Sequence, residues 1–495
     1  MNRLMALFAL AFARCIGAQS SDPFVYDPAF NGGFTLEDRF AATTSATYLL
    51  GLHVALAGNG DTIVAGLVPP AFQSAPANNL GLVRYGPSGE RVAWSNPDPA
   101  YAFFGNRYIA YPNSNFIFSW VDDVKIVDGR IYVLTDVGAL GNARDVVVMV
   151  FDDSGHLVQY MPAFSTGLDE AGAALLPNCY VAFIGGPRIC RLVATATYTT
   201  GSSREIVTMK RFTIAAADGS LSVDNSFGVS NNGAMDHAAP DALCDAGSNC
   251  SWSIRDAVVL RGDTNAPTFY LAGTVSTSAS ASDAFVLGVN GYDGSLETGF
   301  GAGSGHYVNY LADASFGSSV AATTTGGQSS DVVYLASNAG ESCGQGGRVT
   351  KLRAQVVLPG GTSTLPDFSW GDGGTRNVGG NPGSCGNAFT TLTRIALDGD
   401  RLVLSGYEYL TSLPDPLFAI VRASDGALTE FARAGFPARH ADGSPWGHAV
   451  FADVAAAGNG RYVTAGYLYD AAAGDAVLFG TSRFSSDRIF GDGFD

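Results

Sequence analysis

The stretch LHVALAGNGDTIVAG (Leu52–Gly66) predicts the fold of this chain. Apolar residues alternate with polar or small ones on both sides of Asn59-Gly60, a pair typical of tight hairpin turns. Related units follow as VKIVDGRIYVLT (Val124–Thr135), IALDGDRLVLSG (Ile395–Gly406) and VAAAGNGRYVTAG (Val454–Gly466). A hairpin of two short strands therefore recurs along the chain.

Seven such units can be aligned, and each is followed by a further strand, a Gly turn and an aromatic-Gly segment. The aligned first-strand positions are Val54, Val124, Val181, Ala257, Val320, Ile395 and Val454, with a mean spacing of about 67 residues. A repeat of this length holds about four strands with their turns and loops. The sequence therefore predicts an all-β fold, a seven-bladed β-propeller, because a ring covers the exposed edges of every repeat. A linear β-solenoid or two smaller sandwiches are the alternatives.

The composition is typical of short strands joined by tight turns, and the net charge argues against some classes of function. Of 495 residues only 15% are charged, and 62 are glycine. The net charge of −17 argues against nucleic-acid binding, which needs a basic surface, and against a polybasic membrane anchor.

The N-terminus has the pattern of an export signal. Arg3 precedes the apolar run Leu4–Ala13, and Ala18 offers a cleavage point. We expect a signal peptide over residues 1–18, an N-terminal segment over 19–51 and the seven-repeat propeller over 52–495, with no transmembrane segment. A buried helix is one alternative, and a lipoprotein at Cys15 is another, although Arg14 before that cysteine disfavours it.

The cysteine count fits an exported chain. Without Cys15, six cysteines remain, and an even number outside the cytoplasm suggests disulfides. Sequence proximity favours the pairs Cys179–Cys190, Cys244–Cys250 and Cys343–Cys385. Cys179 and Cys190 flank Gly185-Gly186, as a cross-strand pair in one hairpin would. Free buried thiols are the alternative, and no Cys or His spacing indicates a metal site.

Three short elements of the repeats resemble the delta-60 repeat of secreted and surface bacterial proteins. An apolar strand ends in Ala-Gly at Ile63–Gly66 and Val463–Gly466, a strand ends in arginine at Val421–Arg422, and Asp224–Gly228 matches the closing Asp-x-x-Phe-Gly. The third copy lacks Ala-Gly, and the fifth lacks the Asp-Gly turn. The resemblance implies a propeller-like structural or binding role in a bacterial protein, and it implies no catalytic residues.

The N-terminal segment contains DPAFNGGF (Asp27–Phe34), which resembles the end of a repeat but precedes the first copy. We therefore expect residues 22–40 to supply a displaced outer strand that pairs beside Ala476–Phe484 and closes the ring.

No catalytic motif is present: the chain lacks Gly-x-Ser-x-Gly, a phosphate loop and HExxH. Polar residues do recur just before or at the start of the first strand, and these are His53, Asp123, Asp256, Arg394 and Asp453. In a propeller they would form a ring at the channel mouth that binds a cation or a polar ligand. Alternatively, they cap strand ends by bonding backbone amides. Asp/Gly turns could bind Ca²⁺, but ordinary turn chemistry explains them, and we expect no cofactor.

Two function classes fit these features. The first is an exported non-catalytic propeller that acts as a binding or surface module, as a monomer, with a glycan or a surface protein as partner. The second is a secreted polysaccharide hydrolase or lyase that uses the channel-mouth carboxylates, with tryptophans as sugar platforms. One large aromatic per repeat is more often core between sheets. The sequence does not decide whether the protein is an enzyme, but these features favour the non-catalytic class.

Overall fold

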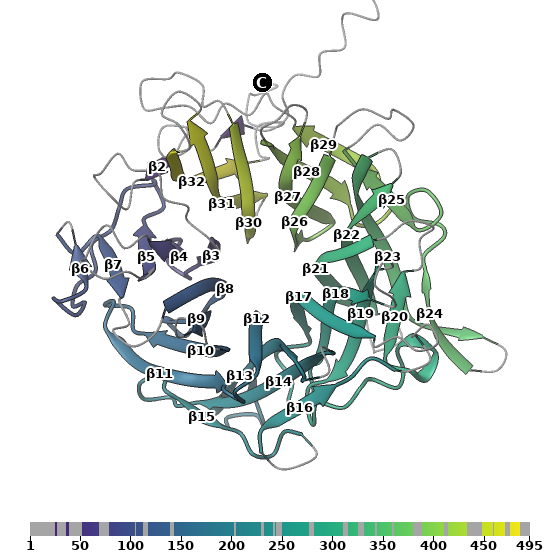
Figure 1. Ribbon diagram of the computed structural model, residues 1–495, viewed down its shortest axis with the longest axis horizontal. Coiled ribbons are helices and arrows are strands. Elements are labelled where there is room, and N and C mark those ends of the chain that lie inside the picture. The colour runs from purple at the N-terminus through teal and green to yellow at the C-terminus, as the bar shows by residue number, and fades with distance from the viewer. Residues whose placement is uncertain are drawn as a thin grey trace, which may run out of the picture.

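A computed structural model shows an all-β propeller in which separate sheets surround a central channel (Figure 1). The structure describes residues 25–26, 36–38, 52–68, 79–103, 105–111, 117–138, 143–201, 204–228, 232–240, 243, 250–276, 282–309, 315–324, 331–341, 344–358, 361–379, 389–409, 414–432, 448–458, 460–470 and 476–485. No helix within these ranges has the length and apolarity needed to cross a bilayer.

The described strands form seven antiparallel sheets, which we number in chain order. Sheet 1 contains β3 (His53–Leu56), β4 (Thr62–Val68), β5 (Asn79–Tyr85), β7 (Tyr108–Tyr111) and β6 (Ala102–Phe103). Sheet 2 contains β8 (Ile117–Val127), β9 (Arg130–Gly138), β10 (Arg144–Phe151) and β11 (Leu157–Phe164). Sheet 3 contains β12 (Asp169–Val181), β13 (Arg188–Thr199), β14 (Glu205–Ile214), β15 (Leu221–Val223) and β16 (Ala234–His237).

The remaining four sheets repeat this plan. Sheet 4 contains β17 (Ser251–Leu260), β18 (Thr268–Ser276), β19 (Ser282–Asn290) and β20 (His306–Asn309), with the 3₁₀ helix η4 (Gly301–Gly303) before β20. Sheet 5 contains β21 (Ser315–Thr324), β22 (Asp331–Glu341), β23 (Gly344–Leu358), β24 (Gly361–Pro366) and β25 (Thr375–Val378). Sheet 6 contains β26 (Phe389–Asp398), β27 (Arg401–Tyr409), β28 (Pro414–Arg422) and β29 (Leu428–Ala432). Sheet 7 contains β30 (His448–Gly458), β31 (Arg461–Asp470) and β32 (Ala476–Ser485), together with β1 (Val25–Tyr26) and β2 (Leu36–Asp38).

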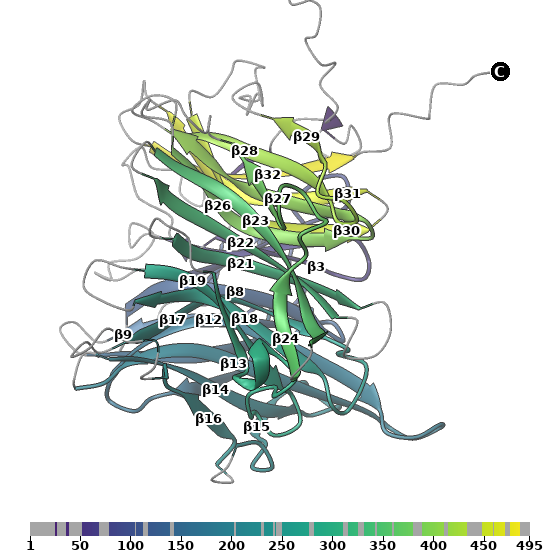
Figure 2. The ribbon, with the colours of Figure 1, turned by 90° about the vertical axis from the view of Figure 1, so that its right-hand side faces the viewer.

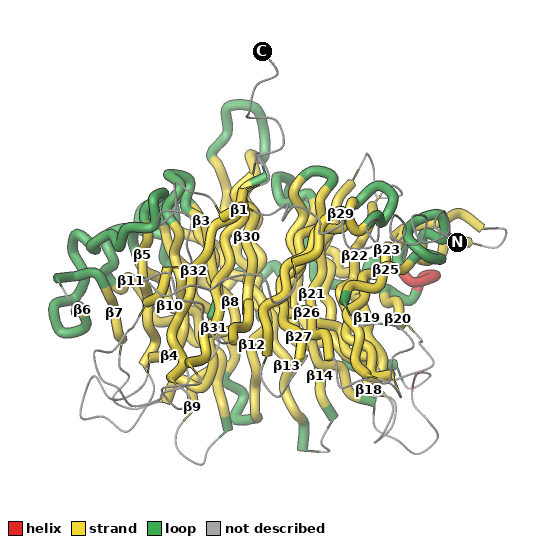
Figure 3. The backbone as a smooth tube through the Cα atoms, turned by 90° about the horizontal axis from the view of Figure 1, so that it is seen from above, coloured by secondary structure: helices red, strands yellow, loops and turns green. Residues whose placement is uncertain are grey.

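In each sheet the first three strands form an antiparallel meander, and the first strand lies innermost, with β30, β31 and β32 counted as the first three of sheet 7. The strands run between two faces of the ring, so the turns after the first and third strands meet on one face, which we call the turn face (Figure 3). The Asp128-Gly129 turn between β8 and β9 shows the local cause: both residues have positive φ, 48° and 75°, as a two-residue hairpin turn requires.

The hydrophobic core lies between neighbouring sheets. Seven buried clusters each combine side chains of two adjacent sheets, and one of them joins Val54 and Val64 of sheet 1 to Val463 and Ala465 of sheet 7. Trp94, Trp252 and Trp370 are buried in these clusters, as predicted for large aromatics of the repeats, whereas Trp120 is 42% exposed. Trp446 lies outside the described residues.

One repeat was aligned wrongly from the sequence. Val181 is the last residue of β12, and the residue that corresponds to Val124 and Ala257 is Leu175, six positions earlier. The hairpin of β12 and β13 is longer than the others, and its Gly185-Gly186 turn was taken for the usual one. The Cys179–Cys190 disulfide is present, and the two residues are direct cross-strand partners, as predicted. Cys250 is also disulfide-bonded, while Cys244, Cys343 and Cys385 lie outside the described residues.

The N-terminal segment contributes two short strands to the last sheet. Val25 and Tyr26 of β1 pair with Ser485 and Phe484, and β2 pairs with Phe479–Thr481 of the same strand. This is the strand beside which the sequence analysis placed residues 22–40. The outermost position of sheet 7 is therefore filled from the opposite end of the chain.

Deleting residues 19–40 should expose the edge of β32, because no other described strand pairs with that edge. We expect the melting temperature to fall by about 5 °C or more and the protein to associate. Differential scanning calorimetry and light scattering measure both effects. If the variant has the same melting temperature as the full chain and stays monomeric, the segment does not fasten the ring.

Candidate functional site

The five polar residues predicted at the channel occupy equivalent positions on the innermost strands. Six of these strands have a register shift next to the position, for example between Val121 and Asp123 of β8, and β3 begins at His53. We call these the ring positions. They are His53, Asp123, Ala174, Asp256, Ser319, Arg394 and Asp453, one from each sheet.

Ala174 and Ser319 were not predicted. Ser319 directly precedes the aligned first-strand residue Val320, so the rule that identified Asp123 and Asp256 would have found it. Ala174 has no polar signal, and the misplaced third repeat hid it.

The innermost strands have backbone N–H groups that need hydrogen-bond acceptors, and residues at the ring positions supply these acceptors. Each first strand pairs on one side only, so the backbone N–H groups of its other edge face the channel without strand partners. An unpaired buried N–H costs about as much free energy as a lost hydrogen bond. The residue after each ring position contributes one such N–H.

Three aspartates satisfy six of these seven N–H groups, two each. The Oδ1 atoms of Asp123, Asp256 and Asp453 accept from the residue that follows them, Val124, Ala257 and Val454, each at 2.8 Å. The Oδ2 atoms accept from the next sheet, namely from Leu175 at 2.8 Å, Val320 at 3.1 Å and Val54 at 3.0 Å. Each carboxylate therefore links its own sheet to the following one.

Ser319 satisfies the seventh N–H. Its Oγ accepts from the backbone N of Ile395 at 3.1 Å, and its hydroxyl donates to Asp256 Oδ2. All seven edge amides at this level thus have side-chain partners, which come from four residues. The strand-capping alternative accounts for these bonds.

Arg394 lies at the centre and joins the three aspartates. Its guanidinium contacts Asp256 Oδ1 at 2.7 Å, Asp453 Oδ1 at 3.1 Å and Asp123 Oδ1 at 3.5 Å. The side chain is 11% exposed. Burial by itself lowers the pKa of Arg394, but the three carboxylates outweigh burial and raise it. Arg394 of sheet 6 therefore connects sheets 2, 4 and 7 across the channel.

Two further side chains contact these carboxylates. Lys125 Nζ lies 2.7 Å from Asp123 Oδ1, and His53 Nδ1 lies 3.4 Å from Asp453 Oδ2. Burial raises the pKa of Asp453, but Arg394, His53 and the Val54 amide lower it further, so the net shift is downward. Each of the three aspartates has four such contacts, which is about the acceptor capacity of a carboxylate.

A cavity of about 270 Å³ lies in the channel beside this ring. Arg394, Asp256, Asp453 and Lys125 line one part of it, and apolar residues of the innermost strands such as Val259, Val320 and Ile395 line the rest. The polar groups that reach the cavity are already engaged with one another. The cavity therefore offers an apolar wall more than free ligating oxygens.

A second pair of carboxyl groups was not predicted. Asp122, the extra residue in the register shift of β8, is buried close to Asp136 of β9, and each of the two carboxyl groups affects the pKa of the other. Burial, and the adjacent carboxylate, raise the pKa of Asp122 well above its usual value, and burial raises the pKa of Asp136 to about 6. Asp136 also accepts from the Gly172 amide at 2.8 Å and lies 3.5 Å from Arg144, which pairs with Asp169.

The Asp122–Asp136 pair does not match a glycosidase. Hydrolysis of glycosidic bonds needs two carboxyl groups about 5–10 Å apart, with the substrate between them. Here the two groups lie close together in the core and are 7% and 1% exposed, so no substrate can enter between them. Their arrangement joins sheet 2 to sheet 3.

Comparisons with known proteins give only distant structural likenesses, which carry no argument on fold or function. No family model matches the chain, and no curated protein matches it. The periplasmic gluconolactonase of Pseudomonas aeruginosa aligns over 77% of this chain and 84% of its own, with 10% identity and a TM-score of 0.38. A neuraminidase-like protein from A/bat/Guatemala/164/2009 aligns over 93% and 96%, with 8% identity and a TM-score of 0.37. The endo-arabinase of Bacteroides thetaiotaomicron aligns over 66% and 99%, with 9% identity and a TM-score of 0.31.

Replacing the central arginine should be strongly destabilising. Arg394→Met leaves three buried carboxylates without their shared counter-charge, and breaking a buried ion pair from one side costs about 3–5 kcal/mol. Chemical denaturation measures the loss. The matched control is Arg422→Met, because the Arg422–Asp425 pair is exposed on both sides and such pairs contribute about 0–1 kcal/mol. Equal unfolding free energies for the two variants would contradict the role of Arg394.

The raised pKa values of Asp122 and Asp136 make stability depend on pH. The folded pKa values lie above the ordinary value near 3.9, so the stabilisation is present in acid and is lost as pH rises through about 6 and beyond. Asp122→Asn replaces this carboxyl group with a neutral amide that does not titrate. Between pH 5 and 8 we expect the wild type to lose on the order of 1–3 kcal/mol relative to the variant.

Unfolding free energies of both proteins across this range test the expectation. All other titratable groups are common to both proteins, so their contributions cancel in the difference. Parallel pH profiles would contradict the raised pKa of Asp122.

Proposed function

We propose that the chain is an exported, non-catalytic seven-bladed propeller that acts as a binding or surface module. Each of the seven sheets would be one blade, formed by one repeat of about 67 residues. The delta-60 resemblance agrees with such a module and stays a prediction.

The observation that supports this proposal most directly is that the ring carboxylates are already engaged in hydrogen bonds and ion pairs. Asp123, Asp256 and Asp453 each accept from two backbone amides and contact Arg394. A general base or nucleophile needs an oxygen that reaches the substrate. Carboxylates that are buried and fully engaged stabilise the ring and leave no such oxygen. The ring therefore supports a structural role for the channel, with recognition elsewhere on the surface.

Export is part of the proposal. The N-terminal leader supports it, and the Cys179–Cys190 disulfide is typical of an oxidising compartment. N-terminal sequencing of the exported protein should give a chain that begins after Ala18. A soluble protein that retains Met1 would contradict export.

The alternative is a secreted polysaccharide hydrolase or lyase that uses the channel carboxylates. Both proposals can be tested with the purified mature protein on a panel of neutral and acidic polysaccharides, by measuring released reducing ends and unsaturated products. We expect the wild type to release no more product than the Asp256→Asn variant. The matched control is Asp293→Asn, which changes an exposed turn residue. Turnover that is lost in Asp256→Asn, but kept in Asp293→Asn, would establish the enzyme and overturn the non-catalytic role.

A further inference from the structure

One inner hairpin extends farther on the turn face than the other inner hairpins whose turns the structure describes. In sheet 2 the turn at Asp128 comes five residues after the ring position Asp123, whereas in sheet 3 the turn begins at Phe183, nine residues after Ala174. Four extra residues per strand correspond to about 13 Å. Figure 2 shows this hairpin, in blue-teal at the lower right, projecting past the neighbouring turns. We call residues 179–190 the finger.

The tip of the finger is apolar and exposed. Val181 is 52% exposed, Phe183 is 65% exposed, and Ile184 is fully exposed. Among the described residues seven large hydrophobic side chains are exposed, and three of them lie on this tip. Single exposed apolar residues need no explanation, but a cluster of them at a projecting tip marks an interaction site.

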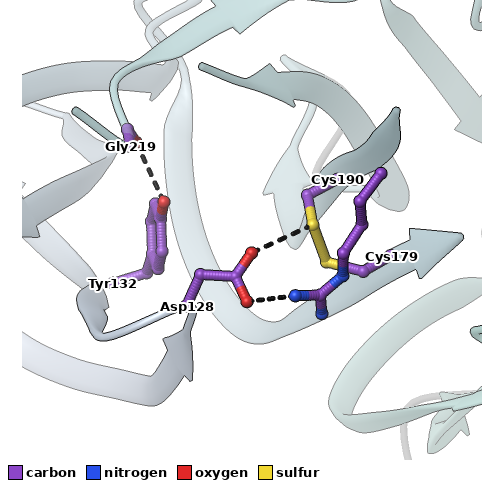
Figure 4. The surroundings of a disulfide bond; sticks show 6 residues. Asp128, Tyr132, Cys179, Cys190 and Gly219 are labelled. Carbon is purple, nitrogen blue, oxygen red and sulfur yellow. Dashed lines mark hydrogen bonds and ion pairs between the residues drawn. A yellow bond between two sulfur atoms is a disulfide. The ribbon is translucent and has the colours of Figure 1, made fainter. Parts of the chain in front are cut away.

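The base of the finger is held rigidly. The Cys179–Cys190 disulfide joins its two strands, and the Cys179 amide donates to the carbonyl oxygen of Gly262 in sheet 4 at 3.0 Å. On the other side, Asp128 of sheet 2 pairs with Arg188 and lies 3.5 Å from Cys190 Sγ (Figure 4). Asp128 and the two sulfur atoms lie close enough to hold a metal, but the disulfide leaves no thiolate to ligate one.

The surface around the finger is acidic. Turns of three other sheets, namely sheets 2, 4 and 6, carry exposed aspartates on the same face. These are Asp128, Asp153, Asp263, Asp293, Asp400 and Asp425, and Asp218 of sheet 3 is exposed as well. Arg188, Arg353, Arg401, Arg422 and Arg461 are exposed there too, and Arg188 and Arg422 each pair with one of these aspartates. The face therefore has an excess of negative charge, in line with the net charge of −17.

We propose that the finger is a docking element that inserts Phe183 and Ile184 into an apolar pocket of a protein partner whose pocket rim is basic. The proposal deepens the binding role above and rests on it. A rigid tip loses little conformational entropy on binding, which favours a pocket of fixed shape. Buried aromatic and aliphatic anchors of this kind contribute most of the affinity in protein interfaces.

The same observations disfavour two other occupants. A fluid bilayer needs no preformed tip shape, and an acidic face is repelled by anionic lipid. A second copy of this chain, docked face to face, would bring two acidic faces together. A partner with a basic rim around an apolar pocket complements both the negative charge of the turn face and the apolar tip.

Photo-crosslinking tests the proposal with the full exported chain. We would place p-benzoylphenylalanine at Ile184, irradiate it among the exported proteins of the producing cells, and identify and purify the crosslinked protein. The purified partner should bind the wild type at least tenfold more tightly than Phe183→Ser/Ile184→Ser. Raising the salt to 1 M should weaken binding severalfold, because the rim contacts are ionic. Tyr292→Ser, which removes an equally exposed aromatic elsewhere on the turn face, should change affinity less than twofold.

The disulfide provides a second variant that keeps the tip side chains. Cys179→Ser/Cys190→Ser should weaken binding about threefold or more, because the loosened finger must be ordered on docking. Four outcomes would overturn the finger proposal: no crosslinked protein, equal affinity of wild type and tip variant, tip-dependent binding to phosphatidylcholine vesicles, or tip-dependent self-association in analytical ultracentrifugation. A partner bound without the tip would leave the binding role intact, whereas polysaccharide turnover would overturn that role itself.

Discussion

The structure depends on how the inner edge of each sheet is satisfied. A propeller turns one edge of every sheet toward its channel, where backbone N–H groups have no strand partners. Here Asp123, Asp256 and Asp453 each cap one amide of their own sheet and one of the next, and Ser319 caps the remaining one. The same bonds that satisfy the edges also tie neighbouring sheets together.

Three carboxylates at one level of a narrow channel repel one another unless a cation lies between them. Arg394 meets that need, because its planar guanidinium has donors in several directions and stays charged when buried. Its contacts run to sheets 2, 4 and 7, while the core clusters connect only adjacent sheets. The arginine is thus a long-range connection, and it gives the ring a common centre. With its carboxylates engaged in this way, the channel is a poor place for acid–base chemistry, which directs attention to the turn face.

Much of the fold could be predicted from the sequence, because its signals are local. Alternation of apolar residues and turn pairs such as Asp128-Gly129 indicated the hairpins, and proximity indicated Cys179–Cys190. The polar ring residues were found because they stand at one fixed point of the repeat. Their contacts could not be predicted, because Arg394 meets aspartates that lie 271, 138 and 59 positions away, and only ring geometry brings these groups together.

The errors have equally physical causes. The third repeat was misaligned because its inner hairpin is extended and turns at Gly185-Gly186, so Val181 was taken for Leu175. Ala174 carries no polar signal, and Asp122 turns toward Asp136 only because of a register shift in β8 that no residue pattern announces. The exposed tip at Phe183 and Ile184 looked like an ordinary apolar strand segment, since exposure depends on what surrounds it.

Hydrogen–deuterium exchange on Arg394→Met and Arg422→Met tests the central claim most directly. If the ring residues act as one unit around Arg394, peptides from the innermost strands of sheets 2, 4, 6 and 7 should all exchange faster in Arg394→Met than in the control. Their neighbours in sheets 1, 3 and 5 should follow, because Asp453, Asp123 and Asp256 cap their amides. Faster exchange confined to β26, the strand that carries Arg394, would contradict the account.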